Sequence, residues 1–186
     1  MGPPRYCWDR LEERAGQRGN GAPRAFAHTV SGAARGVLIA VAAVMAQVDV
    51  HFNVADRVHH ACRVVRKARA AGKTVLVYTR DADRLARFDE ALWTFSALDF
   101  IAHVYAGSPL AEATPVWLSA EPLALNRDVL LVLDDEVAPA YAQWFEPFER
   151  VIDVVSRDEA ERASARERFK RYREEGLAPT AHDMAG

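Results

Sequence analysis

The sequence predicts an α/β fold, an open and mostly parallel β-sheet with helices on both of its faces. Two observations predict it. Short apolar runs typical of buried strands alternate with amphipathic segments of helical period along residues 47–175. Several of these runs are apolar at every position, which is the pattern of strands covered on both faces of a parallel sheet.

Six segments have the length and composition of strands. The first alternates apolar and polar residues, whereas the others are rich in β-branched and other apolar residues and are bounded by turn residues. The expected strands are 47–53, 74–79, 100–104, 115–120, 129–133 and 151–156.

Four further segments have the composition of helices. The first two carry apolar stripes at helical spacing, the third is short, and the last is highly charged. Gly72 and Gly176 predict where two of them end. The order of strands and helices favours a Rossmann-like arrangement. The expected helices are 55–71, a segment beginning at Asp81, 141–148 and 157–175.

The first 44 residues differ from the rest of the chain. They are rich in Gly, Pro, Ala and Arg and show no sustained period. The apolar run 37–48 is shorter than the roughly 20 residues of a membrane span, and it lies later than a secretory signal would. We therefore expect Met45 to be the natural start, with residues 1–44 a disordered extension or translated upstream sequence, and residues 45–186 to form the domain.

The composition indicates which classes of partner to expect. The formal net charge is -2, and positive charge gathers locally in 157–173, which holds seven basic and four acidic residues. This is not the broad basic face of a duplex-binding protein, so we expect no strong direct binding to nucleic acid. Cys7 and Cys62 belong to no CxxC or Cys/His cluster, so neither a disulfide framework nor a zinc site is indicated. A reducing cytoplasm fits best.

An enzyme that binds a nucleotide or small molecule on the same fold is the alternative. The turn after the first strand, FNVADR, contains no glycine, so neither GxGxxG nor GxxxxGK[ST] exists there. No GxSxG nucleophile motif occurs either. The sequence therefore gives this alternative no ligand site, and we expect neither a cofactor nor a catalytic residue.

Two groups of side chains were weighed as metal ligands. His51, His59 and His60 lie near the first strand–helix junction, but adjacent helical residues point about 100° apart, so a pair of imidazoles in series suits no single metal. The expectation is one partly buried and one solvated ring. The acidic loop 134–136 could hold Mg²⁺, yet without a phosphate-binding loop a solvated turn is favoured.

The charged helix presents one face that suits binding. Arg162, Arg166, Phe169 and Arg173 are spaced by 4, 3 and 4 residues and fall on one side of a helix. If the helix packs back on the sheet, this face meets Val155 at the end of the preceding strand. Arginines beside an aromatic ring can recognise a carboxylate next to an apolar group. The other interpretation is a solvated face whose arginines pair with neighbouring glutamates.

Three stretches carry a resemblance to a known family. DEALWTFSALDFIAHVYAG at 89–107, RDVLLVL at 127–133 and VIDVVSRDEAERASARERFKRYREEG at 151–176 resemble the chi subunit of bacterial DNA polymerase III holoenzyme, and the likeness extends over 45–186. It implies a non-catalytic subunit of the clamp loader assembly. Such a subunit binds the acidic C-terminal tail of single-stranded DNA-binding protein, which ends in Phe with its free carboxylate, and pairs with the psi subunit.

The resemblance also implies roles for individual residues. Arg162 stands where the family has lysine, which keeps the charge, and Phe169 where it has tyrosine, which removes the hydroxyl through which that ring could form a hydrogen bond. Phe100 corresponds to the psi contact, although Ala102 replaces the family's proline, and the sequence leaves open whether a helicase shares that surface. The tail-binding residues implied by the likeness, together with Arg173 on the same helical face, are Trp93, Val155, Arg162, Arg166, Phe169 and Arg173.

The aromatic segment 89–100 receives a divided interpretation. Trp93, Phe95, Leu98 and Phe100 cannot all lie on one helix face. We expect Phe95 and Leu98 to enter the core, and Trp93 and Phe100 to remain on the surface as anchors for different partners.

Overall fold

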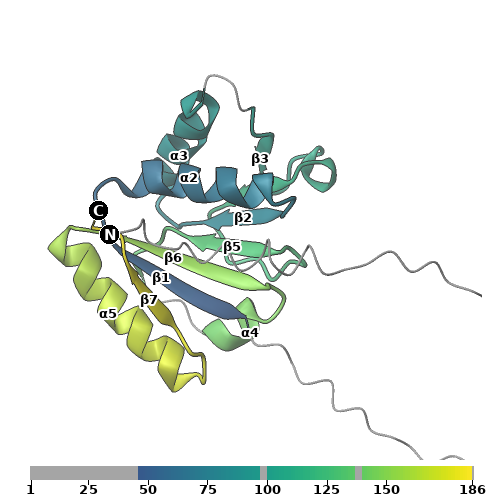
Figure 1. The fold of residues 1–186 in the computed structure, drawn as a ribbon. Coiled ribbons are helices and arrows are strands. Elements are labelled where there is room, and N and C mark those ends of the chain that lie inside the picture. The colour runs from purple at the N-terminus through teal and green to yellow at the C-terminus, as the bar shows by residue number, and fades with distance from the viewer. Residues whose placement is uncertain (1–45, 97–99, 137–139, 186) are drawn as a thin grey trace, which may run out of the picture. The chain divides into compact units, whose positions relative to one another are not determined.

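Seven strands form one parallel sheet within the part of the chain that the structure describes (Figure 1). The structure is a computed structural model that describes residues 46–96, 100–136 and 140–185. The expectation for residues 1–44 lies outside these ranges. Across the sheet the strands follow the order β3-β4-β2-β5-β6-β1-β7. The fold class predicted from the sequence is confirmed.

The interior strands are the ones that the sequence predicts best. Strands β2, β4 and β5 are buried at every position, as their uniformly apolar sequences indicate. Strand β3 begins three residues later than expected, and β7 was not predicted. The strands are β1 Gln47–Val54, β2 Val75–Tyr78, β3 His103–Tyr105, β4 Val116–Ser119, β5 Val129–Val132, β6 Arg150–Ser156 and β7 Thr180–Asp183.

The longer helices begin and end at the residues that sequence rules favour. The side chains of Asp56, Asp81 and Asp158 each accept a hydrogen bond from the backbone amide three residues later, which caps α2, α3 and α5. Gly72 and Gly176 adopt positive φ just beyond α2 and α5. The helices are α2 Arg57–Ala70, α3 Ala82–Thr94, α4 Tyr141–Phe145 and α5 Glu159–Glu174, with a 3₁₀ turn at Ala111–Ala113.

The direction of each connection decides which face its helix covers. The chain moves toward the β3 edge through α2 and α3, and toward the β7 edge through α4 and α5. Right-handed crossovers in opposite directions place their helices on opposite faces of a sheet. Figure 1 shows this arrangement, with α2 and α3 on one side and α4 and α5 on the other.

Aromatic packing joins α4 and α5 to the sheet. The ring of Tyr172 lies 4.7 Å from that of Tyr141 and 5.6 Å from that of Phe145, measured between centroids, and all three are buried. The same apolar cluster includes Val155 of β6. No helix within the described ranges is long and apolar enough to cross a bilayer.

Candidate functional site

Ion pairs fill the edge of the sheet at which the strands end. Open α/β sheets bind ligands there, between neighbouring strands whose following loops lead to opposite faces. Strands β1 and β6 form one such pair, and β2 and β5 form another. We name the charged side chains that occupy these two positions the carboxyl-edge network. Its members are Arg57, Arg80, Arg84, Asp134, Asp135, Glu136 and Glu161.

The carboxyl-edge network engages the acidic loop that was weighed as a magnesium site. Asp135 accepts hydrogen bonds from Arg57 and from Arg84, the latter at 2.5 Å. Burial opposes ionisation of the Asp135 carboxyl, but these two guanidinium groups outweigh it and lower its pKa. Arg80 lies 2.8 Å from both Asp134 and Glu136. Arginines therefore occupy the crevice that a nucleotide-binding enzyme would use.

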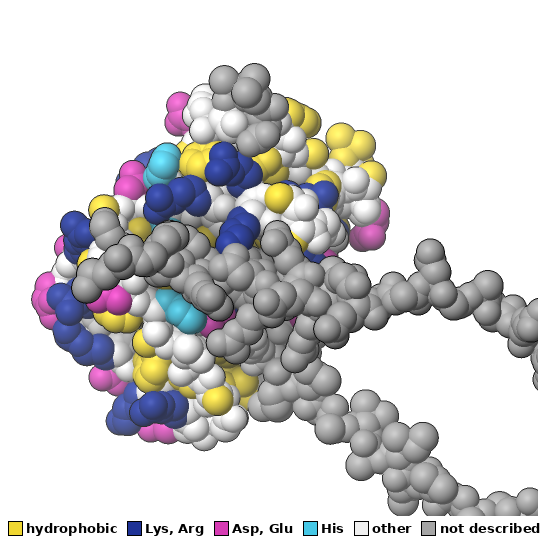
Figure 2. All heavy atoms as spheres, in the orientation of Figure 1, with side chains coloured by type: hydrophobic (Ala, Val, Ile, Leu, Met, Phe, Trp, Pro, Cys, Tyr) yellow, Lys and Arg dark blue, Asp and Glu magenta, His cyan; other side chains and the backbone are white. Residues whose placement is uncertain are grey.

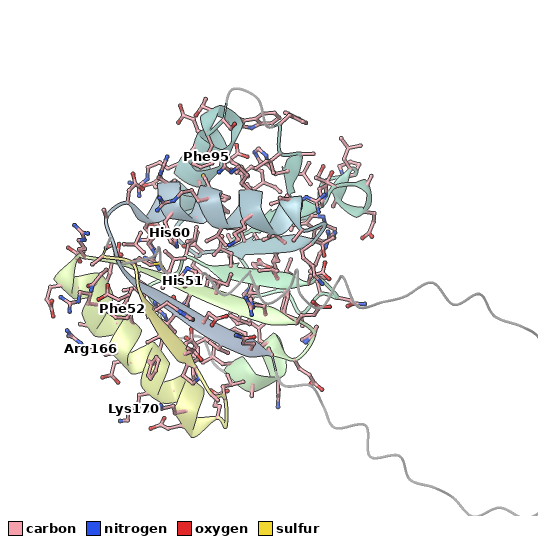
Figure 3. The ribbon with its side chains drawn as sticks, viewed as in Figure 1. His51, Phe52, His60, Phe95, Arg166 and Lys170 are labelled. Carbon is pink, nitrogen blue, oxygen red and sulfur yellow. The ribbon has the colours of Figure 1, made fainter. Side chains whose placement is uncertain are left out.

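Two of the histidines weighed as metal ligands contact one another between strand β1 and helix α2. The rings of His51 and His60 (Figure 3) approach with Nδ1 of His51 2.9 Å from Nε2 of His60, and both side chains are buried. His59 is exposed. Burial, followed by charged neighbours, lowers the pKa of His51 to about 3 and that of His60 to about 4. The expected split between one buried and one solvated ring is thus observed. Within the described ranges, no group of three or more His, Cys, Asp or Glu side chains could hold a metal ion.

The outer side of α5 carries a shallow, open pocket, and we name this side the α5 face. Arg166, Phe169 and Arg173 line it together, as their spacing predicts, and Lys170 and Glu174 complete it. The Arg173 guanidinium carbon lies 5.0 Å from the centroid of the Phe169 ring. The pocket therefore combines an apolar floor with several cations, and Lys170 is a member that the sequence analysis did not name.

Two other expected residues extend or support the α5 face. Arg162 lies beside the pocket, since Glu159 accepts hydrogen bonds from both Arg162 and Arg166. Val155 is only 1% exposed and belongs to the core cluster against which Phe169 packs. Val155 therefore belongs to the core on which α5 packs, and it does not line the pocket. Figure 2 shows basic and acidic side chains interspersed along the flank of the molecule formed by α5.

A buried charged cluster fixes the inner side of α5. Arg168 donates two hydrogen bonds of 2.9 Å to the carboxylate of Asp153 on β6, and the Tyr172 hydroxyl donates a third of the same length. Burial disfavours the charge on Arg168, but Asp153 outweighs it and raises the arginine pKa. Sequence analysis missed this cluster. The signal was an aspartate inside the otherwise apolar strand VIDVVS, which requires a buried cationic partner.

Aromatic side chains gather where α3 meets the outer strand β3. Trp93 is 54% exposed and Phe100 is 74% exposed, and their ring centroids lie 5.4 Å apart. Trp93 also lies 4.7 Å from the ring of His103, whose Nε2 is 3.1 Å from a carboxylate oxygen of Asp89. Tyr105 is likewise exposed. We name Trp93, Phe100 and Tyr105 the α3–β3 edge.

The structure thus separates Trp93 from the other predicted tail-binding residues. Trp93 is on α3, in the α2–α3 layer, whereas the α5 face lies on the opposite side of the sheet (Figure 1). Phe95 follows α3 and is half-buried, 5.0 Å from the His59 ring and on the opposite side of the sheet from Arg166 (Figure 3). It packs on α2 and does not reach the core, so the expectation that Phe95 would be a core residue is wrong. Leu98 lies outside the described residues.

Comparisons with known proteins agree with the resemblance in the sequence. The family model described as DNA polymerase III chi subunit, HolC, matches residues 45–180. The DNA polymerase III subunit chi of Pseudomonas aeruginosa is 35% identical over 128 residues, which cover 69% of this chain and 87% of the relative. The subunit chi of Escherichia coli is 31% identical and covers 62% and 78% of the two chains.

Solved structures extend the likeness of fold. S. cerevisiae Dbp5 L327V bound to RNA and ADP BeF3 superposes with a TM-score of 0.53 at 8% sequence identity. The match covers 76% of this chain and 42% of that one. At this identity the likeness concerns the arrangement of strands and helices alone.

Proposed function

Because the chain belongs to the DNA polymerase III chi subunit family, we propose that it is a non-catalytic accessory subunit of the holoenzyme that binds the acidic C-terminal tail of single-stranded DNA-binding protein. It would link that protein to the clamp loader through psi, in the cytoplasm. The observation that carries the proposal is the pocket on the α5 face, where cationic side chains surround the half-buried ring of Phe169.

The geometry suggests how each end of the tail would bind. The terminal Phe ring would pack on Phe169, and the terminal carboxylate would pair with Arg166, which lines the same pocket. Arg162 and Arg173 would meet the acidic residues that precede the terminus. The hydroxyl that the family's tyrosine supplies is missing at Phe169, so ring packing replaces a hydrogen bond there.

The affinity expected from these contacts is modest. Burying a terminal Phe stabilises the complex by about 2 to 3 kcal/mol. A well-formed guanidinium–carboxylate pair adds about 1.5 to 3 kcal/mol, and each exposed pair adds about 0.2 to 1 kcal/mol. Ordering the flexible tail offsets part of this gain. With backbone contacts included, binding should lie near micromolar, on the order of 8 kcal/mol.

The α3–β3 edge is the proposed surface for psi. Exposed aromatics that touch one another are typical anchors of protein interfaces, and Phe100 is the most exposed of those present. Trp93 contacts Phe100 and is remote from the α5 face, so we now assign it to this edge, although the resemblance places it with the tail. Ala102, next to the edge, lacks the rigidity of the family's proline.

Titration calorimetry with an acidic peptide ending in Ile-Pro-Phe tests the proposal. We expect binding near micromolar for the free acid. The same peptide without its last Phe, or with an amidated terminus, should bind at least tenfold more weakly. Equal affinity for all three peptides would contradict the assigned site.

A further inference from the structure

Glu159 already occupies the cations that an acidic tail would need. Its two carboxylate oxygens accept hydrogen bonds from the Nη1 groups of Arg166, at 3.0 Å, and of Arg162, at 3.4 Å. Glu159 and Arg166 are seven residues apart, two helical turns, so they share one side of α5, and both side chains are more than half exposed there. One carboxylate thus bridges both arginines at the N-terminal end of the pocket.

We propose that Glu159 is an internal competitor of the acidic ligand, which must displace it to reach Arg166. The inference rests on the proposed function of the α5 face. An incoming carboxylate meets guanidinium donors that are already engaged and also meets the negative charge of Glu159 itself. Because the side chain of Glu159 is 71% exposed, the bridge is a weak surface interaction that a ligand can open.

The other acidic residues of α5 do not share this arrangement. Glu161 faces the carboxyl-edge network, where it lies 3.4 Å from Arg57. Glu174 lies 3.8 Å from Lys170 at the other end of the pocket. Glu167 is exposed and makes no ion pair with any residue that the structure describes. Glu167 therefore offers a control with the same change of charge on the same helix.

The inference predicts a gain of affinity from removing a charge. Glu159→Gln should bind the free-acid peptide ending in Ile-Pro-Phe about two- to fivefold more tightly than wild type, the size expected for exposed ion pairs. Glu167→Gln should stay within about 1.5-fold of wild type, because it alters only the overall field. In wild type, salt screens both the pairs between ligand and arginines and the competing Glu159 bridge, so the two effects partly offset each other. Glu159→Gln lacks the bridge, so its affinity should fall more steeply with added salt than that of wild type.

A double-mutant cycle tests whether Glu159 acts through Arg166. In an Arg166→Ala background, the gain from Glu159→Gln should shrink to the level of the Glu167→Gln control. Equal gains of affinity from Glu159→Gln and Glu167→Gln would show that Glu159 is not a competitor of the ligand, and would leave the proposed function intact. Failure of the wild type to bind the peptide would overturn both. A gain that persists undiminished without Arg166 would also overturn the inference.

Discussion

The α5 face and the α3–β3 edge are two exposed surfaces built from different chemistry. The α5 face combines one half-buried ring with several cations around a pocket. The α3–β3 edge presents Trp93 of α3 and Phe100 of the segment before β3, and both side chains are more than half exposed. The difference suggests that salt would weaken binding at the first surface and have little effect at the second.

The two surfaces also differ in how they are held. The α5 face rests on Arg168, which is fully buried and bonded to Asp153 and to the carbonyl oxygen of Asp135. The α3–β3 edge rests on contacts of Trp93 with Phe100 and with His103. A fixed helix can keep its arginines in register, whereas a pair of exposed rings can adjust to a partner.

Removing the support of α5 should have the largest effect. Arg168→Met leaves the buried Asp153 without its cationic partner and with only the Tyr172 hydroxyl as a donor, which we expect to lower the free energy of unfolding by about 3 to 5 kcal/mol. Urea denaturation measures the loss. Arg171→Met on the exposed side of the same helix is the control and should change stability by less than about 0.5 kcal/mol. A loss below 1 kcal/mol for Arg168→Met would show that the buried pair does not anchor α5.

The next-largest effect should come from acid, which should destabilise the fold at the buried pair His51 and His60. His51 and His60 have pKa values of about 3 and about 4 in the fold, below the ordinary 6.5. Below pH 6.5 the unfolded chain takes up protons that the folded chain refuses. Stability is therefore complete above pH 6.5 and falls with acid, by up to about 1.4 kcal/mol per pH unit for each group.

Denaturation between pH 7.5 and 5 checks this expectation. Between pH 6.5 and pH 5 the free energy of unfolding should fall by about 2 kcal/mol if one histidine contributes and by about 4 kcal/mol if both do, since each loses about 1.4 kcal/mol per pH unit. His60→Gln should flatten the profile, whereas His59→Gln, at an exposed position, should leave its slope unchanged. A wild-type profile without a slope would contradict the buried histidine pair.

The sequence predicts regular, buried features better than isolated polar ones. Uniform apolar runs mark β2, β4 and β5 because a strand covered on both faces accepts little else. Strand β7 escaped prediction because TAHD is polar and mostly exposed, and it joins the sheet through backbone bonds to β1. Its residues carry no periodic signal that could distinguish a strand from a turn.

The candidate site was predictable where it lies on one element. Helical spacing alone places Arg166, Phe169 and Arg173 around one pocket. The position of Trp93 depends on how α3 packs against the sheet, and this is a tertiary property that no local spacing contains. Arg168 resembles its exposed neighbours in the sequence, and only the direction of the α5 inner side shows that it is buried.

On the α5 face, Arg166→Ala should weaken the binding of the free-acid peptide by about 1.5 to 3 kcal/mol, at least tenfold in affinity, because it removes the partner of the terminal carboxylate. Arg162→Ala should cost about 0.2 to 1 kcal/mol, since its ligand would be a mobile aspartate in solvent. Calorimetry at 0.05 and 0.3 M salt should show several-fold weaker wild-type binding at the higher salt. Wild-type affinity in Arg166→Ala would contradict the assignment.

The smallest expected effect on tail binding tests whether the surfaces are independent. Phe100→Ala removes the most exposed ring of the α3–β3 edge. It should weaken the binding of psi by at least about 1 kcal/mol, which reduced co-purification would reveal. Its affinity for the acidic peptide should stay within about twofold of wild type, because Phe100 contacts Trp93 of α3, and α3 and α5 cover opposite faces of the sheet (Figure 1). Added salt should leave the psi interaction nearly unchanged, in contrast to the tail. Equal loss of both interactions would mean that the two partners use one surface and that Trp93 belongs with the tail after all.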